Sequence, residues 1–462
     1  MERTLIKDLD KHTGKEVSIS GWVDVRRDQG KLIFFDFRDM TGKVQGVVLP
    51  ASAAMETAKG IRDEFVVTIT GKVNERPEKN RQADKLNGGI ELEILNITVL
   101  NTAEPMPFDI HNDTRQINEE VRLKYRYLDL RSERMQKNIR MRDKIISFFR
   151  EYMHKNDFVE IETPMLMKGT PEGSREYVIP SRLHQGKFYV LPQSPQQFKQ
   201  LSMVAGFERY FQIARCMRDE DQRGDRQPEF TQLDFEMSFV EREDVLSYTE
   251  AMFIELVKNL YPEKEITETP FPRLTYKECM EKYGNDKPDM RKDKNNPNEL
   301  AFAWIVDFPM FEKTENGEIQ AAHHPFCSIN PEDMEKFMTG KDIFSIRANS
   351  YDLVLNGYEL SSGSIRIHES AVQKRVFELL EINEEKQRAK FGHMLDAFKY
   401  GAPPHGGFAP GIDRIVMLLQ NEPNIREVIA FPKTGEGKDL MMNAPSEIEE
   451  KQLKELGLSV KK

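Results

Sequence analysis

The sequence has 462 residues, of which 39% are hydrophobic and 31% are charged, and its formal net charge at pH 7 is −10. This composition is typical of a folded globular protein of roughly three domain-sized units, and it excludes both a disordered chain and a uniformly basic nucleic-acid binder. The N-terminus is charged from its second residue, and no apolar run approaches the roughly 20 residues needed to span a bilayer, so we expect neither export nor membrane insertion.

The three cysteines, Cys216, Cys279 and Cys327, lie far apart and form no CxxC pair. They predict neither a disulfide framework nor a cysteine zinc site, and they favour a reducing, cytoplasmic location. Residues 1–103 carry equal numbers of acidic and basic side chains, so the negative excess lies in the rest of the chain. Any contact with nucleic acid is therefore expected to be local.

The first part of the chain contains five strand-like runs, with a helical segment at 51–62 after the third: 17–23, 32–38, 44–49, 65–73 and 90–100. This order is typical of the five-stranded Greek-key barrel that binds oligonucleotides, and a generic small barrel is the alternative. Arg26, Arg27 and Lys31 cluster near Phe34 at the first hairpin, and cations beside an aromatic ring suit unstacked bases. We therefore expect an oligonucleotide-binding barrel at residues 1–104.

A linker is expected at residues 105–131, where Pro105 and Pro107 accompany few apolar residues. Ser132 is a good helix cap, and apolar residues then repeat at helical spacing: Ile139, Ile146, Phe149 and Met153. Further along, residues 241–260 have the pattern of an amphipathic helix, and the polar residues 282–300 that of an exposed loop. The main domain is expected at residues 132–462.

The densest mixture of charges lies between two strand-like runs at 211–215 and 230–239, and consists of Arg215, Arg218, Arg223, Arg226, Asp219, Glu220, Asp221 and Asp225. Gly224 and Pro228 mark a long turn within it. Taken alone, such a segment is as compatible with a solvated, self-neutralising hairpin as with a binding loop.

Six motifs occur in order along the chain: TPEGSREY (170–177), LPQSPQQFKQ (191–200), MRDED (217–221) followed by RQPEFTQLDFEMSF, HHPF (323–326), NGYELSSGSIRIH (356–368) and GFAPGIDR (407–414). Together they resemble the motifs of the class II aminoacyl-tRNA synthetases. The lysine of QQFKQ makes the resemblance stronger to the aspartate branch of that family than to its lysine or asparagine branches. The resemblance implies an α+β fold in a homodimer, with an N-terminal OB-fold anticodon-binding barrel and a catalytic domain built on a six-stranded antiparallel sheet flanked by helices.

The resemblance implies that L-aspartate is activated with ATP, with Mg²⁺ as cofactor, and then transferred to tRNA-Asp. Because a carboxylate is already ionised at neutral pH, its attack on the α-phosphorus needs positioning and charge neutralisation but no general base. Whether tRNA-Asn is also charged stays open, and the loop at 26–31 bears on that choice. The alternative from another class is a paralogue that binds RNA as a regulator without charging tRNA.

The resemblance also assigns roles to individual residues. ATP is assigned to Arg218, Asp219, Glu220, Gln227, Phe230, Glu359, Gly411, Ile412, Asp413 and Arg414, with Arg218, Glu359 and Arg414 as the catalytic group. Aspartate is assigned to Glu172, Gln196, Gln197, Phe198, Lys199, Arg218, Asp234, His323, His324 and Arg366. Magnesium is assigned to Asp352 and Glu359, and the tRNA anticodon to Arg27, Phe34 and Gln45. If these roles hold, Arg218, Arg366 and Arg414 must meet at one pocket.

The sequence departs from the family pattern at two places. A domain that bacterial relatives usually carry is expected to be absent near residues 287–300. Serines replace commoner glycines at Ser361 and Ser362, so the pocket wall is expected to differ in detail there.

Overall fold

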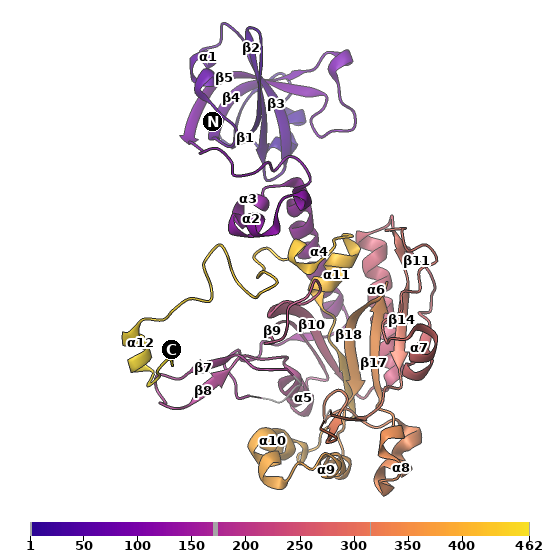
Figure 1. Ribbon diagram of the computed structural model, residues 1–462. Coiled ribbons are helices and arrows are strands. Elements are labelled where there is room, and N and C mark those ends of the chain that lie inside the picture. The colour runs from indigo at the N-terminus through magenta and orange to yellow at the C-terminus, as the bar shows by residue number, and fades with distance from the viewer. Residues whose placement is uncertain (1, 170–173, 315, 462) are drawn as a thin grey trace. The chain divides into compact units, whose positions relative to one another are not determined.

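The computed structural model describes residues 2–169, 174–314 and 316–461. The chain forms two compact units, Met1–Asp109 and Ile110–Lys462 (Figure 1). Across the described ranges, no helix combines the length and the apolar character that crossing a bilayer requires.

The first unit is a closed barrel whose strands neighbour one another in the order β1-β2-β3-β5-β4. Its elements are β1 (Glu16–Gln29), β2 (Leu32–Asp39), β3 (Gly42–Val48), α1 (Met55–Gly60), β4 (Val66–Glu75) and β5 (Ile90–Asn101). Strand alternation explains the core: Ile33, Phe35 and Phe37 of β2 are buried, while Phe34 and Asp36 between them are half-buried on the other face. The predicted five strands, with a helix after the third, are confirmed.

The second unit is organised around an eight-stranded sheet in the order β12-β14-β17-β18-β19-β10-β9-β6 (Figure 1). These strands are β6 (Val159–Glu160), β9 (Arg209–Met217), β10 (Glu229–Ser238), β12 (Arg273–Thr275), β14 (Phe302–Val306), β17 (Ser350–Leu355), β18 (Tyr358–Ile365) and β19 (His405–Phe408). The six strands from β14 to β9 are antiparallel, which confirms the predicted sheet, and the short edge strands β12 and β6 extend it in parallel.

Helices and three small sheets complete this unit. The helices are α2 (Glu119–Lys124), α3 (Arg126–Asp129), α4 (Glu133–Lys155), α5 (Gln196–Val204), α6 (Arg242–Leu260), α7 (Tyr276–Tyr283), α8 (Met334–Thr339), α9 (Ser370–Leu379), α10 (Glu384–Phe398), α11 (Ile412–Leu419) and α12 (Glu450–Glu455). The small sheets pair β7 (Val178–Pro180) with β8 (Phe188–Val190), β11 (Glu265–Ile266) with β13 (Glu299–Leu300), and β15 (Phe311–Lys313) with β16 (Ile319–Ala321).

Strand β10 separates the hydrophobic core from a polar face. Leu233, Phe235 and Met237 belong to one hydrophobic cluster with residues of α4, α6 and α11. Because side chains alternate along a strand, Asp234 and Glu236 lie on the opposite face, where both are fully buried. The fold therefore places charged groups in the interior on the side of the sheet away from this core.

Helix α4 begins as the sequence predicts, since the Ser132 side chain accepts a hydrogen bond from a backbone amide of the first turn. Its buried stripe is shifted, however. Ile145 and Phe149 are fully buried, whereas the expected core residues Ile139 and Ile146 are half-buried. The prediction is thus right for the helix and only partly right for its buried face.

Residues 110–131, expected to be part of a linker, belong to the second compact unit. Arg122 donates two hydrogen bonds to Glu427 at 2.8 and 3.0 Å, and Arg126 donates to Asp129 at 2.7 Å. Burial acts to raise the pKa of Glu427, but the hydrogen bonds and charge of Arg122 prevail and lower it to about 2. Buried ion pairs therefore attach this segment to the rest of the second unit.

Candidate active site

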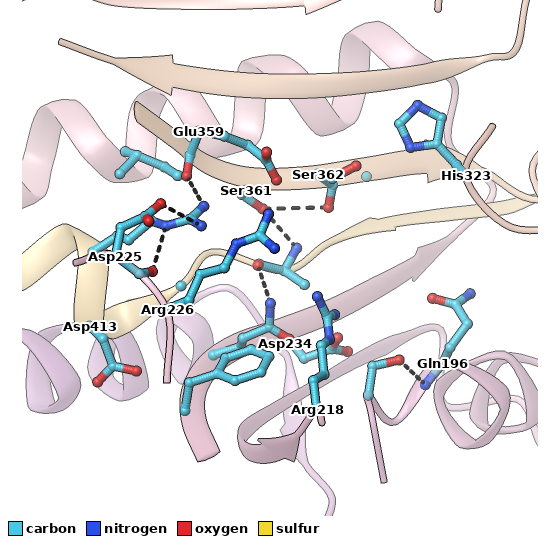
Figure 2. A pocket seen from close by; sticks show the side chains of 18 of the residues that line it. Gln196, Arg218, Asp225, Arg226, Asp234, His323, Glu359, Ser361, Ser362 and Asp413 are labelled. Atoms are coloured by element: carbon cyan, nitrogen blue, oxygen red, sulfur yellow. Dashed lines mark hydrogen bonds and ion pairs between the residues drawn. The ribbon is translucent and has the colours of Figure 1, made fainter. Parts of the chain in front are cut away.

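A pocket of about 370 Å³ lies on the polar face of the sheet (Figure 2). It is lined by residues of α5, β10, β18, α11 and the charged loop 218–228. The predicted site residues that line it are Gln196, Lys199, Arg218, Glu220, Gln227, Phe230, Asp234, His323, His324, Glu359, Arg366, Gly411, Asp413 and Arg414. Arg218, Arg366 and Arg414, from three distant segments, thus meet at one pocket.

Five predicted residues are not among those that line the pocket: Gln197, Phe198, Asp219, Asp352 and Ile412. On α5, Gln196 and Lys199 are three residues apart and share a face, so the two residues between them point elsewhere. Asp219 is exposed, and Ile412 belongs to the hydrophobic core. Glu172 lies outside the described residues. The roles of these residues stay predictions, and in α5 and α11 the motif neighbours that do not line the pocket point away from those that do.

Buried charges form a network around Arg366. This guanidinium donates to Glu236 at 2.9 and 3.2 Å, to the Ser364 hydroxyl at 2.6 Å and to Nε2 of His324 at 2.8 Å. These contacts use four of its five N–H groups. The Lys199 ammonium lies 3.5 Å from the same Glu236 carboxylate. Two buried cations therefore share one buried carboxylate.

The pKa values of the two carboxylates in this network are shifted in opposite directions. Burial raises the pKa of Asp234, even though Lys199 donates to it at 3.0 Å. Burial acts in the same direction on Glu236, but Arg366 and Lys199 prevail and hold its pKa below the usual range. Burial, together with the charge of Arg366, lowers the pKa of His324 well below its ordinary value. The lowered pKa favours the neutral imidazole, whose ring lies between the Arg366 guanidinium at Nε2 and the Phe326 backbone amide at Nδ1.

The second histidine is placed differently. The His323 ring packs edge-on against Phe308, with ring centroids 5.0 Å apart, and burial lowers its pKa. Two adjacent histidines thus line the pocket with different partners, since His324 contacts Arg366 and His323 contacts an aromatic side chain.

Arg218 lies over the Phe230 ring, with its guanidinium carbon 5.1 Å from the ring centroid. Its buried Nε has no hydrogen-bond partner among the described residues. Two residues further along the chain, Glu220 accepts from the Ser174 hydroxyl and pairs with Arg226 at 3.1 Å. Arg218 thus lines the pocket as a cation stacked on an aromatic ring, and a guanidinium group can bind phosphate.

Arg414 joins two parts of the pocket. Its Nη1 donates to the backbone carbonyl of Glu359, and its Nη2 lies 3.0 Å from a carboxylate oxygen of Asp225. The contact with Asp225 ties α11 to the charged loop, so that loop is no freely solvated hairpin.

Two of the predicted ATP ligands, Asp413 and Gln227, form hydrogen bonds within the protein through both polar atoms of the side chain. The carboxylate of Asp413 accepts from Arg142 and from the backbone amide of Thr231. The amide of Gln227 exchanges two hydrogen bonds, at 2.7 and 3.1 Å, with the backbone of Lys433. Their side chains therefore join elements around the pocket that they line, and their role in ATP binding stays a prediction.

Asp352 and Glu359, the predicted metal ligands, come from neighbouring strands β17 and β18. Asp352 is buried, and its Oδ1 has no hydrogen-bond partner among the described residues. Burial raises its pKa well above the ordinary value, and the nearby charge of Glu359 adds to this rise. An orphaned buried oxygen beside a second carboxylate is a suitable donor set for a divalent cation.

The predicted anticodon residues lie together on one face of the barrel. Arg27 donates to Asp36 at 2.7 and 3.0 Å and to Gln45 at 3.5 Å, and Phe34 pairs with Arg27 in the strand register. Arg26 is placed elsewhere, because it bonds Asp28 and backbone carbonyls of residues 59 and 61. Of the expected cluster of Arg26, Arg27 and Lys31 near Phe34, Arg27 thus lies beside the ring, whereas the Arg26 side chain bonds other groups.

Sequence reasoning missed Glu236 and Asp36, which orient cations of the two sites. Glu236 could have been found by alternation, since it lies two residues from Asp234 on the same strand face. Asp36 has the same relation to Phe34. In both cases the neighbouring functional residue was recognised and its companion on the strand was not.

Comparison with known proteins gives two family matches. A model described as tRNA synthetases class II (D, K and N) matches residues 118–435, and one described as OB-fold nucleic acid binding domain matches residues 17–100. An aspartate–tRNA(Asp/Asn) ligase of Rubrobacter xylanophilus is 41% identical over 97% of this chain and 95% of its own length. An aspartate–tRNA ligase of Staphylococcus carnosus is 38% identical over 97% of each.

Solved structures share the fold at lower identity. An asparaginyl-tRNA synthetase from Pyrococcus horikoshii in complex with asparaginyl-adenylate has a TM-score of 0.75 at 21% identity, covering 94% of this chain and 98% of its own. A putative aspartyl-tRNA synthetase from Leishmania major has a TM-score of 0.75 at 22% identity, covering 93% of both chains.

Proposed function

This chain belongs to the class II tRNA synthetases of the D, K and N group, and we propose that it is an aspartate–tRNA ligase. In this reaction L-aspartate attacks the α-phosphorus of ATP, pyrophosphate leaves, and the aspartyl group is then transferred to the 3′ end of tRNA. The observation that carries the proposal is the convergence of Arg218, Arg366 and Arg414 on one pocket, with Lys199 beside Arg366. Full-length relatives named as aspartate–tRNA ligases support it.

The proposed chemistry uses the cations of the pocket. Arg218, whose Nε is unpaired among the described residues, holds the α-phosphate, where negative charge builds up in the transition state. Phe230 offers a face for adenine, and Arg414 holds the other end of the nucleotide. Since the substrate's carboxylate is ionised at neutral pH, these residues position and neutralise, and none of them removes a proton.

Asp352 and Glu359 would hold Mg²⁺, because together they offer an unpartnered buried oxygen and a neighbouring carboxylate. When bound, the ion would neutralise triphosphate oxygens and stabilise the leaving pyrophosphate. The remaining residues of the site orient the two substrates.

Aspartate would be selected by Arg366 and Lys199. Arg366 keeps one N–H beyond its four hydrogen bonds to described residues, and it is held in place by Glu236. An amide in place of the substrate's side-chain carboxylate loses a buried charge pair, which costs roughly 3–5 kcal/mol, or two to three orders of magnitude in preference. Such a site discriminates without editing.

The barrel would recognise the anticodon through Arg27, Phe34 and Gln45, which share one face where the half-buried Phe34 ring lies among polar groups. We further propose a homodimer that works in the cytoplasm. Exposed apolar side chains at and after edge strand β6, such as Val159 and Leu166, support the dimer, and three buried cysteine thiols support a reducing compartment.

We also propose that the inserted domain of bacterial relatives is absent between α7 and β13. The alignment with the Rubrobacter xylanophilus protein spans 574 positions, which exceeds the 462 residues of this chain. None of the six motifs lies in that segment, so adenylate formation does not need the missing domain.

The test is amino-acid-dependent exchange between ATP and pyrophosphate, followed by aminoacylation of tRNA-Asp and tRNA-Asn transcripts. Exchange with aspartate and charging of tRNA-Asp are expected, with exchange on asparagine at least about 100-fold weaker. Some relatives are named aspartate–tRNA(Asp/Asn) ligases and others aspartate–tRNA ligases. Charging of the tRNA-Asn transcript therefore tests whether this chain accepts tRNA-Asn as a second tRNA substrate. Absence of both exchange and charging would instead support the RNA-binding regulator, which the names of the relatives do not favour.

A further inference from the structure

Lys287 connects the loop between α7 and β13 to the proposed metal site. Its Nζ lies 2.9 Å from Oε2 of Glu359, and the two side chains are 36% and 28% exposed. Arg414 donates to the backbone carbonyl of the same Glu359. One carboxylate residue is thus held by an ammonium from a loop that the sequence predicts to be fully exposed.

This loop has a defined structure. The Lys287 amide donates to Asn285 at 2.8 Å, and the Asn285 carbonyl accepts from the Cys279 thiol at 3.2 Å. Pro288 is buried. The loop also packs against the turn between β17 and β18, where a Cβ on Gly357, at φ +87°, would lie 3.4 Å from Cβ of Asp289. Local contacts therefore set the position of Lys287 next to Glu359.

An ammonium and a divalent cation compete for the same carboxylate. Mg²⁺ binds a carboxylate oxygen at about 2.1 Å, which would bring it within a few ångströms of the ammonium and cause strong repulsion. Phosphate oxygens, which arrive with the nucleotide, are the natural new partners of a displaced lysine, since a lysine ammonium is a common phosphate ligand. The half-exposed side chain of Lys287 has the length and freedom for this exchange.

We propose that Lys287 is an exchangeable counter-cation of Glu359, which pairs with this carboxylate in the nucleotide-free protein and moves to a phosphate oxygen when ATP binds with its metal. This inference rests on the proposed role of Glu359 as a metal ligand. It assigns a nucleotide-binding residue to the loop that occupies the place of the missing domain, and it explains how a carboxylate is kept neutralised before substrate arrives.

The test is Lys287→Gln in the full-length protein, with two affinities that should shift in opposite directions. Without nucleotide, Mn²⁺ should bind the variant about tenfold more tightly than wild type, because the competing ammonium is gone. With saturating Mg²⁺, a non-hydrolysable ATP analogue should bind about tenfold more weakly, because a charged phosphate contact is lost. Calorimetry measures both affinities. Lys294→Gln, which changes an exposed lysine of the same loop, should change neither.

Further variants separate the possible failures. Lys287→Arg, which keeps the positive charge, should keep the analogue affinity within about threefold. If Lys287→Gln does not fold, Lys287→Met, which also removes the charge, replaces it in both measurements. Unchanged Mn²⁺ and analogue affinities in Lys287→Gln would overturn the inference, as would two shifts in the same direction. If Glu359→Gln leaves Mn²⁺ binding to the nucleotide complex unchanged, the proposed metal site itself is wrong. If Glu359→Gln abolishes that binding while Lys287→Gln has no effect, only the inference fails.

Discussion

Glu236 is the carboxylate on which the buried charge network depends, and its replacement by the isosteric glutamine is a direct test of that network. Glu236 is fully buried, accepts from Arg366 at 2.9 and 3.2 Å, and lies 3.5 Å from the Lys199 ammonium. Glu236→Gln keeps the volume but leaves two buried cations short of one negative charge. Removing one partner of a buried ion pair costs about 3–5 kcal/mol, so we expect a loss of that size in the free energy of unfolding.

Glu229 provides the matched control because it lies on the same strand and also contacts two cations. It pairs with Arg215 at 2.6 Å and with Lys433 at 3.1 Å, but its side chain is 37% exposed. Exposed pairs contribute about 0–1 kcal/mol, so Glu229→Gln should have little effect. Urea denaturation at pH 7, followed by tryptophan fluorescence, compares the two variants, and equal losses would refute the reasoning.

The pH dependence of the free energy of unfolding gives a second test of the Glu236→Gln variant. The pKa of Glu236 is lowered in the folded protein, so its ionised form stabilises the fold above the unfolded-state pKa of about 4.3, and this contribution is lost as the pH falls through the folded pKa. The difference between wild type and Glu236→Gln should therefore be constant from pH 8 to about pH 5 and shrink below that. A difference that persists unchanged at acid pH would indicate a packing effect rather than a charge effect.

Three other variants test separate parts of the molecule. Phe34→Ala should reduce tRNA-Asp charging at least about tenfold by loss of a base-stacking face and leave ATP–pyrophosphate exchange unchanged; an equal fall in exchange would contradict a separate recognition barrel. Arg218→Ala should lower kcat of exchange about 10²–10³-fold, while its melting temperature, measured by circular dichroism, stays near that of wild type. Glu427→Gln should lower the free energy of unfolding by up to about 3 kcal/mol at neutral pH, a loss that should disappear as the pH falls from about 4.5 towards 2, and a constant loss would contradict the lowered pKa.

Local signals in the sequence were enough to predict much of the fold. The five barrel strands and the cap at Ser132 depend on alternation, turn residues and capping, which are properties of neighbouring residues. The six-stranded antiparallel sheet, in contrast, was expected only from the resemblance to a family. The buried face of α4 was less predictable. Ile139 and Ile146 follow the helical period, but the packing of α6 and α11 against α4 decides which apolar residues are fully buried.

The site shows the same division between local and distant information. The motifs identified the arginines that meet in the pocket, but they also suggested that adjacent residues such as Ile412 and Asp413 act together. On a helix, neighbours point about 100° apart, so Ile412 enters the core while Asp413 lines the pocket. Lys287 gave no signal, because its contact with Glu359 joins segments far apart in the sequence and lies in a loop of ordinary polar composition.

The residues proposed to bind aspartate and those proposed to bind ATP are held in different ways, and the difference follows from the fold. The Lys199–Asp234 pair comes from a helix and a central strand, and its side chains are 3% and 1% exposed. The Arg226–Glu220 pair comes from the loop between β9 and β10, and its side chains are 40% and 32% exposed. Buried pairs are costly to break, whereas exposed pairs rearrange at little cost. The aspartate pocket is therefore preformed, as discrimination between an acid and its amide requires, while the loop at the nucleotide side can reorganise around a triphosphate.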